Sequence, residues 1–107
     1  EKAFSIPGPK FMNVLTPCPL GWGHEGGLTP EISQLAADTC MWPLYEVEYG
    51  VYRITYKPKE KKPIEDFLKP QARFRHLFKG EEGEAIRAAI QEWVDWKWEQ
   101  LLNEAGG

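Results

Sequence analysis

Residues 10–30 read KFMNVLTPCPLGWGHEGGLTP, and this stretch decides the predicted fold. Its first part, Lys10 to Thr16, is a nearly continuous apolar run that ends at a proline, which is typical of a buried strand. The segment 17–27 is rich in proline and glycine and predicts a loop. Thr29 then suits an N-cap and Pro30 suits the first helical position, so we expect a helix to begin at Pro30.

The predicted helix presents one apolar face and should end at about Met41 or Trp42, because Pro43 cannot continue it. A strand that is apolar on both faces requires layers above and below it, as in the parallel sheet of an α/β protein. We therefore predict an α/β fragment in which residues 1–44 supply one strand and one helix of a doubly wound layer. The apolar face of the helix contains Ile32, Leu35, Ala36, Thr39 and Cys40.

Residues 45–56 predict a β-hairpin, because two alternating segments flank the two-residue turn Tyr49-Gly50. Pairing outward from this turn places two apolar pairs on one face and a charge-matched pair on the other. The apolar pairs are Val47 with Tyr52 and Tyr45 with Ile54, and the charged pair is Glu46 with Arg53.

The segment 57–80 is a basic connector: Lys57 to Lys79 holds eight Lys or Arg and three acids, inside a chain whose net charge is -3. Pro63 and Pro70 bound a short helix at 63–69. Its few apolar anchors are chiefly Phe67, Leu68, Phe74 and Leu77, so we expect it to form no core of its own. It is either a solvated connector or a docking surface for an acidic partner. A long helix should follow over 82–102, and its apolar arc is wide enough to pack against more than one neighbouring element. The arc contains Ile86, Ile90, Trp93, Val94, Trp98, Leu101 and Leu102, with Trp96 at its edge.

The composition limits the class of protein. A chain of 107 residues holds at most one domain, and 42% hydrophobic and 13% aromatic residues indicate a folded one. The negative net charge argues against binding to nucleic acid or anionic membranes, and no apolar run is long enough to span a bilayer. Two cysteines are too few for a disulfide framework and favour a reducing, cytoplasmic location. The chain begins at Glu1 without an initiator Met, which suggests a piece of a longer protein.

Enzyme motifs are missing from the sequence, which has no CxxC, GxGxxG, GxxxxGK, GxSxG or HExxH. His24 and His76 stand alone, in a loop and in the basic connector, so no catalytic residue is predicted. Cys18 lies between two prolines where the predicted strand ends, which is where ligands bind in open α/β sheets. From these residues alone it is either a small apolar core thiol or one ligand of a metal or iron–sulfur site completed from elsewhere. Cys40, on the apolar helix face, reads as a core thiol, and we expect no disulfide between the two.

Three blocks in one order resemble the carboxyl-terminal region of the β subunit of pyruvate:ferredoxin oxidoreductase, the pyruvate synthase type. They are TPCPLGW at 16–22, LAADTCMWPLYE at 35–46 and KPIEDFLKPQARFRHL at 62–77, and together with the hairpin they cover nearly the whole chain. Ala72 and Tyr49 depart from the family, where Gly and Asn or Asp are usual.

The resemblance implies cofactors. Such β subunits bind thiamine diphosphate with Mg²⁺ and hold a 4Fe-4S cluster with four cysteines, the last of which lies in the Pro-Cys-Pro position of Cys18. Cys18 is therefore expected to be a cluster ligand and Cys40 is not. The thiamine motif and the other three cysteines are absent from the sequence, so this last third of the subunit should be inactive alone. Residues 1–44 would end a thiamine-binding domain, and 45–107 would form its carboxyl-terminal extension.

The implied activity of the complete enzyme is the oxidative decarboxylation of pyruvate to acetyl-CoA in anaerobic metabolism, with electrons passing through iron–sulfur clusters to ferredoxin. Its partners would be the other oxidoreductase subunits, ferredoxin, coenzyme A and pyruvate. Phenylglyoxylate and other 2-oxoacid oxidoreductases share this plan, and these residues do not distinguish the substrate. The alternative from the residues alone is a non-enzymatic protein-interaction module that uses the wide aromatic face of the last helix.

Overall fold

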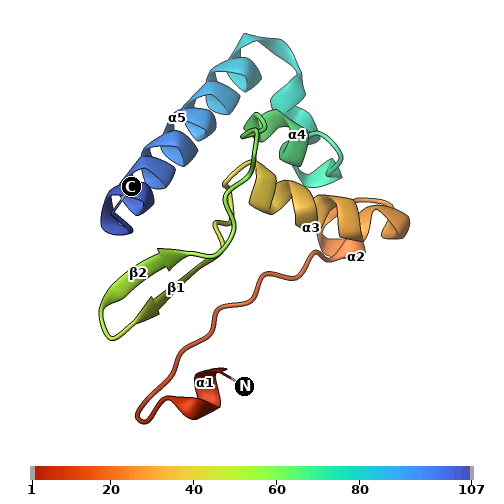
Figure 1. The fold of residues 1–107 in the computed structure, drawn as a ribbon. Coiled ribbons are helices and arrows are strands. Elements are labelled where there is room, and N and C mark those ends of the chain that lie inside the picture. The colour runs from red at the N-terminus through yellow and green to blue at the C-terminus, as the bar shows by residue number, and fades with distance from the viewer. Residues whose placement is uncertain (1, 107) are drawn as a thin grey trace.

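The computed structural model describes residues 2–106 and combines helices with a two-stranded antiparallel hairpin (Figure 1). This mixture agrees with the predicted helix-and-strand fragment. The hairpin and the N-terminal segment extend away from a helical body formed around α3, α4 and α5. In chain order the elements are α1 (Lys2–Ser5), α2 (Pro19–Trp22), the 3₁₀ helix η1 (Gly26–Leu28), α3 (Thr29–Asp38), β1 (Tyr45–Glu48), β2 (Val51–Ile54), α4 (Ile64–Leu68), the 3₁₀ helix η2 (Ala72–Phe78) and α5 (Gly80–Glu104).

The core lies where α3, α4 and α5 meet, and it draws residues from both sides of position 44. Each large apolar side chain in this core stabilises the folded state by about 1.5–3 kcal/mol when it is fully buried. A polar contact fixes α4 against α5, because the Ile64 N–H donates to Gln91 Oε1 at 2.7 Å. The buried cluster contains Ile32, Ala36, Cys40, Ile64, Phe67, Leu68 and Val94.

The helix expected from Pro30 is α3, with Pro30 in its first turn. Thr29 is its first residue rather than its N-cap, and the Thr29 hydroxyl donates to the carbonyl of Gly26. The helix ends at Asp38, so the predicted end near Met41 was wrong. Cys40 has a φ of 63°, a left-handed conformation that no helix continues through, and this turn still leaves the thiol buried in the core.

The hairpin is confirmed with the predicted register. Tyr49 and Gly50 both have positive φ, 52° and 81°, as a two-residue turn of this hand requires. The predicted apolar face is poorly covered, since Tyr45 and Val47 remain about half exposed. On the polar face the Glu46 carboxylate accepts from Arg53 as predicted.

The predicted buried strand at 10–16 was wrong for the described chain. These residues form no strand in the structure, and the side chains of Phe11, Met12 and Val14 are 91%, 76% and 70% exposed. A strand needs a neighbour to accept its backbone hydrogen bonds, and residues 2–106 place none beside it. The segment instead runs from α1 to α2 as extended chain, and of its apolar residues Leu15 is the one that packs against the core (Figure 1).

The basic connector contributes to the core shared with α3 and α5, and two of its expected apolar anchors, Phe67 and Leu68, lie in that core. The short helix at 63–69 is confirmed as α4, and it buries Ile64, Phe67 and Leu68. Leu77 of η2, an element that the sequence did not predict, is buried as well. Phe67, Leu68 and Leu77 were thus expected apolar anchors, whereas the burial of Ile64 was not predicted.

The long helix is confirmed as α5, which extends the predicted 82–102 by two residues at each end. Its packed face is narrower than predicted: Val94 and Leu101 are buried, but Ile86, Trp93 and Trp96 are 42%, 49% and 58% exposed. The described helices include none that is both long and apolar enough for a membrane span.

Candidate functional site

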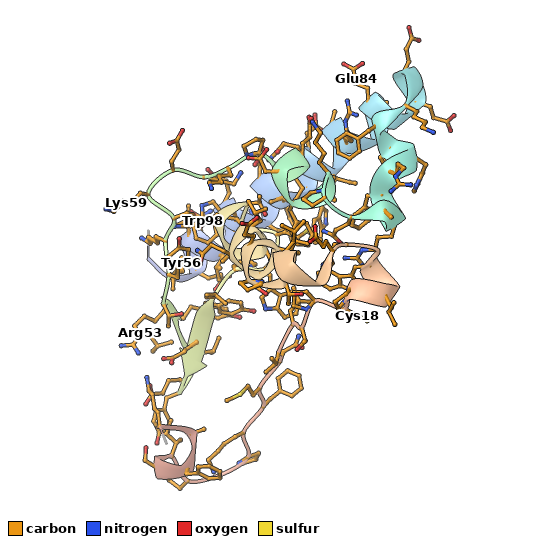
Figure 2. All side chains as sticks on the ribbon, turned by 90° about the vertical axis from the view of Figure 1, so that its right-hand side faces the viewer. Cys18, Arg53, Tyr56, Lys59, Glu84 and Trp98 are labelled. Carbon is orange, nitrogen blue, oxygen red and sulfur yellow. The ribbon has the colours of Figure 1, made fainter. Side chains whose placement is uncertain are left out.

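Cys18 caps the short helix α2. Its backbone is extended, Pro19 occupies the first helical position, and the Cys18 carbonyl accepts from the Trp22 N–H at 2.8 Å. The Cys18 Sγ accepts a hydrogen bond from the Gly21 N–H at 3.4 Å. The thiol is exposed and lies at the edge of the helical body beside α2 (Figure 2).

The surroundings of Cys18 fit a single ligand of a cluster and no more. Residues 2–106 bring together no group of three or more His, Cys, Asp or Glu side chains that could hold a metal ion. A cluster bound by Cys18 would therefore need further ligands from outside these residues. An N–H···S bond like that from Gly21 is one of the features that set the potential of a thiolate-ligated cluster.

The loop after Cys18 is held against α4 and η2 through Trp22. The Trp22 ring meets the ring of Phe67 edge-on at 6.2 Å, and the guanidinium of Arg73 lies 4.1 Å from the Trp22 centroid. The next residue, Gly23, accepts a hydrogen bond from the Ala72 N–H at 2.8 Å. The sequence indicated Cys18 but not these contacts of Trp22 and Gly23, because residues about 50 positions apart in the chain leave no periodic pattern when they meet.

The two histidines occupy the predicted loop and connector. His24 follows α2, is buried, and packs edge-on against Trp22 at 6.2 Å. Its Nδ1 hydrogen-bonds the carbonyl of Glu25 at 2.9 Å, so Nδ1 carries the proton in that contact, and Nε2 has no partner within the described residues. His76 is exposed on η2. Neither histidine joins Cys18 in a metal site among residues 2–106.

Cys40 is a core thiol, as predicted, and both cysteines of the described chain are free. Burial raises the pKa of the Cys40 thiol to about 11, and nearby Lys61 opposes this shift in part. At neutral pH Cys40 is therefore protonated and a poor ligand or nucleophile. Cys18 remains as the accessible thiol.

A polar cluster that the sequence did not reveal joins the end of α3 to Tyr56, at the end of the hairpin segment. The Tyr56 hydroxyl donates to Asp38 Oδ1 at 2.5 Å, and the Gln34 amide donates to the same oxygen at 3.2 Å. The bond to Asp38 raises the pKa of Tyr56. Asp38 and Tyr56 border an open hollow of about 370 Å³, which is also lined by Lys57, Pro58, Lys59, Glu60 and Lys62.

Comparison with known proteins identifies relatives along most of the chain, although no family model matches it. The chain is 50% identical to the pyruvate synthase subunit PorB of Thermotoga maritima over 95% of its own length, and 51% identical to that of Methanocaldococcus jannaschii over 86%. It is 45% identical to the ketoisovalerate oxidoreductase subunit VorB of Pyrococcus abyssi over 94%.

These matches cover 32%, 30% and 32% of the three relatives, so the chain spans about a third of their length. Identities of this size over nearly the whole chain confirm the resemblance that the three sequence blocks indicated. The chain is therefore homologous to a segment of the pyruvate synthase subunit PorB.

Proposed function

We propose that this chain is the carboxyl-terminal part of the β subunit of a 2-oxoacid:ferredoxin oxidoreductase that converts pyruvate to acetyl-CoA. The observation that carries the proposal is the identity of 50–51% to two subunits named pyruvate synthase PorB. The VorB subunits, at 45%, support the wider 2-oxoacid class. These names favour an enzyme subunit over an independent interaction module.

In this proposal Cys18 is one thiolate ligand of a 4Fe-4S cluster, whose other ligands lie elsewhere in the subunit. Three features of the chain support this role: the thiol is exposed, its backbone is stiffened by Pro17 and Pro19, and the Gly21 N–H donates to its sulfur. When bound, the cluster supplies one-electron transfer. The chain's own contribution is to hold the sulfur in a fixed orientation and to donate a hydrogen bond to it.

Thiamine diphosphate and Mg²⁺ belong in this proposal to the rest of the subunit, because the thiamine motif of the family is absent from this sequence. Residues 1–44 would complete the thiamine-binding domain, and 45–107 would extend from it. The exposure of Phe11, Met12 and Val14 supports packing of segment 10–16 against that domain. Further partners would be the other subunits, ferredoxin, coenzyme A and pyruvate, in the reducing cytoplasm that two free thiols favour.

The test is an assay of the complete subunit assembled with its partner subunits. We expect reduction of ferredoxin that requires both pyruvate and coenzyme A, a slower rate with 2-ketoisovalerate, and no activity from the 107-residue chain alone. A faster rate with 2-ketoisovalerate would contradict the choice of pyruvate. Absence of coenzyme A-dependent reduction with every 2-oxoacid tested would contradict the proposed enzyme class.

A further inference from the structure

The guanidinium of Arg73 lies against two aromatic rings beside the Cys18 loop. Its Cζ is 4.1 Å from the centroid of Trp22 and 4.5 Å from that of Phe74. Partial burial lowers the pKa of Arg73, and within residues 2–106 no carboxylate forms an ion pair with it. The rings, rather than an acid, are the principal partners of this cation.

Hydrogen bonds fix Arg73 to the core. Its Nε donates to Gln71 Oε1 at 2.8 Å, and the Gln71 amide donates to the carbonyl of Phe67 at 2.6 Å. Gln71 is 1% exposed and its bond to Phe67 is buried, whereas the bond from Arg73 is only partly buried because Arg73 itself is exposed. A planar guanidinium held at one nitrogen can stack on a ring in only a few orientations.

The contact between Arg73 and Trp22 is linked to Cys18 through the single turn of α2. Trp22, which carries the stacked ring, donates its backbone N–H to the Cys18 carbonyl at 2.8 Å. The turn between them contains the Gly21 N–H that donates to the sulfur. A helix of four residues has little stability of its own, so the contacts of Trp22 must hold it.

We propose that Arg73 is a positioning residue for Cys18: by stacking on Trp22 it holds α2 in place and thereby fixes the hydrogen bond from Gly21 to the ligand sulfur. This inference rests on the proposed role of Cys18 for its effect on a cluster, but the mechanical part concerns the chain alone. Because hydrogen bonds to sulfur tune cluster potentials, the loss of this support changes the potential as well as the mobility of the loop.

The first experiment measures amide hydrogen exchange in the 107-residue chain. In R73A, the amides of Gly21 and Trp22 should exchange about fivefold faster, as expected when a partly desolvated cation–π contact is lost. The control variant is R75A, since Arg75 lies on η2 and its side chain has no hydrogen bond, ion pair or ring contact within residues 2–106. The amide of Val94 reports global unfolding and should be unchanged in both variants.

The second variant, R73K, keeps the charge but removes the planar stack. In R73K the amide of Gly21 should exchange faster than in the wild type but more slowly than in R73A. If R73A also loses protection at Val94, which would indicate global unfolding, R73K is the variant to compare with the wild type. In the assembled enzyme, the midpoint potential of the cluster should shift in R73A or R73K and stay at the wild-type value in R75A.

Wild-type exchange at Gly21 and Trp22 in both Arg73 variants would overturn the inference, as would faster exchange with an unchanged potential. Failure of the proposed function is separate, because it would appear as an unchanged iron content when Cys18 itself is replaced.

Discussion

Gly23 and Ala72 meet in a close backbone approach beside the Cys18 loop. The Gly23 carbonyl accepts from the Ala72 N–H at 2.8 Å, and a Cβ added to Gly23 would lie 2.6 Å from the Cβ of Ala72. Gly23 also has a φ of 71°. This position therefore requires glycine for two independent reasons, and it ties α2 to η2.

Replacement of Gly23 by alanine should lower the free energy of unfolding by about 2–4 kcal/mol, since left-handed strain and a steric clash add. The control is Gly26→Ala, where an added Cβ meets nothing within 4 Å. Urea denaturation of both variants checks this, and adding Ala72→Gly should restore part of the loss by removing the clash. Equal stability of the Gly23 and Gly26 variants would contradict the described packing.

Phe67 should be a principal determinant of stability, although it lies in the most basic part of the sequence. It is 2% exposed in the core, so Phe67→Ala should cost about 3–5 kcal/mol. Phe11→Ala is the matched control, since Phe11 is 91% exposed and its truncation should change stability by no more than about 0.5 kcal/mol. Denaturant titration compares them, and a large cost at Phe11 would show that segment 10–16 is packed in solution.

The elements that the sequence predicted well are those specified locally. The hairpin follows from a two-residue turn and alternating neighbours, and α5 follows from its own periodicity. The prediction of a strand at 10–16 was wrong because it rested on the apolar pattern alone. A strand also needs a hydrogen-bonded partner strand, which residues 2–106 do not supply.

The candidate site was predictable in part. Cys18 stood out through its two flanking prolines and the family resemblance, while its role as a ligand stays a prediction. The support from Arg73 and the hydrogen bond between Asp38 and Tyr56 could not be predicted, since each joins residues far apart without any repeating pattern.

The exposed aromatic face of α5 should cause the isolated chain to self-associate or to bind apolar dyes. Trp93 and Trp96 are 49% and 58% exposed on this face, and Lys97 covers only one ring, that of Trp93. Trp96→Glu should reduce both dye fluorescence and the sedimentation-derived mass at high concentration, whereas Glu99→Gln should not. A strictly monomeric wild-type chain that binds no dye would contradict this expectation.

The two cysteines should differ strongly in reactivity with pH. Iodoacetamide at pH 8 should label Cys18, because that thiol is exposed, and should leave Cys40 unmodified, because Cys40 is buried and its pKa is raised to about 11. Since the folded-state pKa exceeds the ordinary value of 9.0, the stabilising effect of the neutral thiol is complete below about pH 9 and disappears as the pH rises through about 11. Peptide mapping by mass spectrometry measures both sites, and equal labelling at pH 8 would contradict the burial of Cys40.

The most direct test of the central claim is the iron and sulfide content of the assembled enzyme with Cys18→Ser, read together with electron paramagnetic resonance of the reduced form. Cys40→Ala is the control, because Cys40 is a buried thiol outside the proposed site. We predict that the Cys18 variant loses or converts one cluster, with slower electron transfer and retained thiamine binding, while the Cys40 variant keeps the wild-type spectrum. An unchanged iron content and spectrum in Cys18→Ser would contradict the assignment of Cys18 as a cluster ligand.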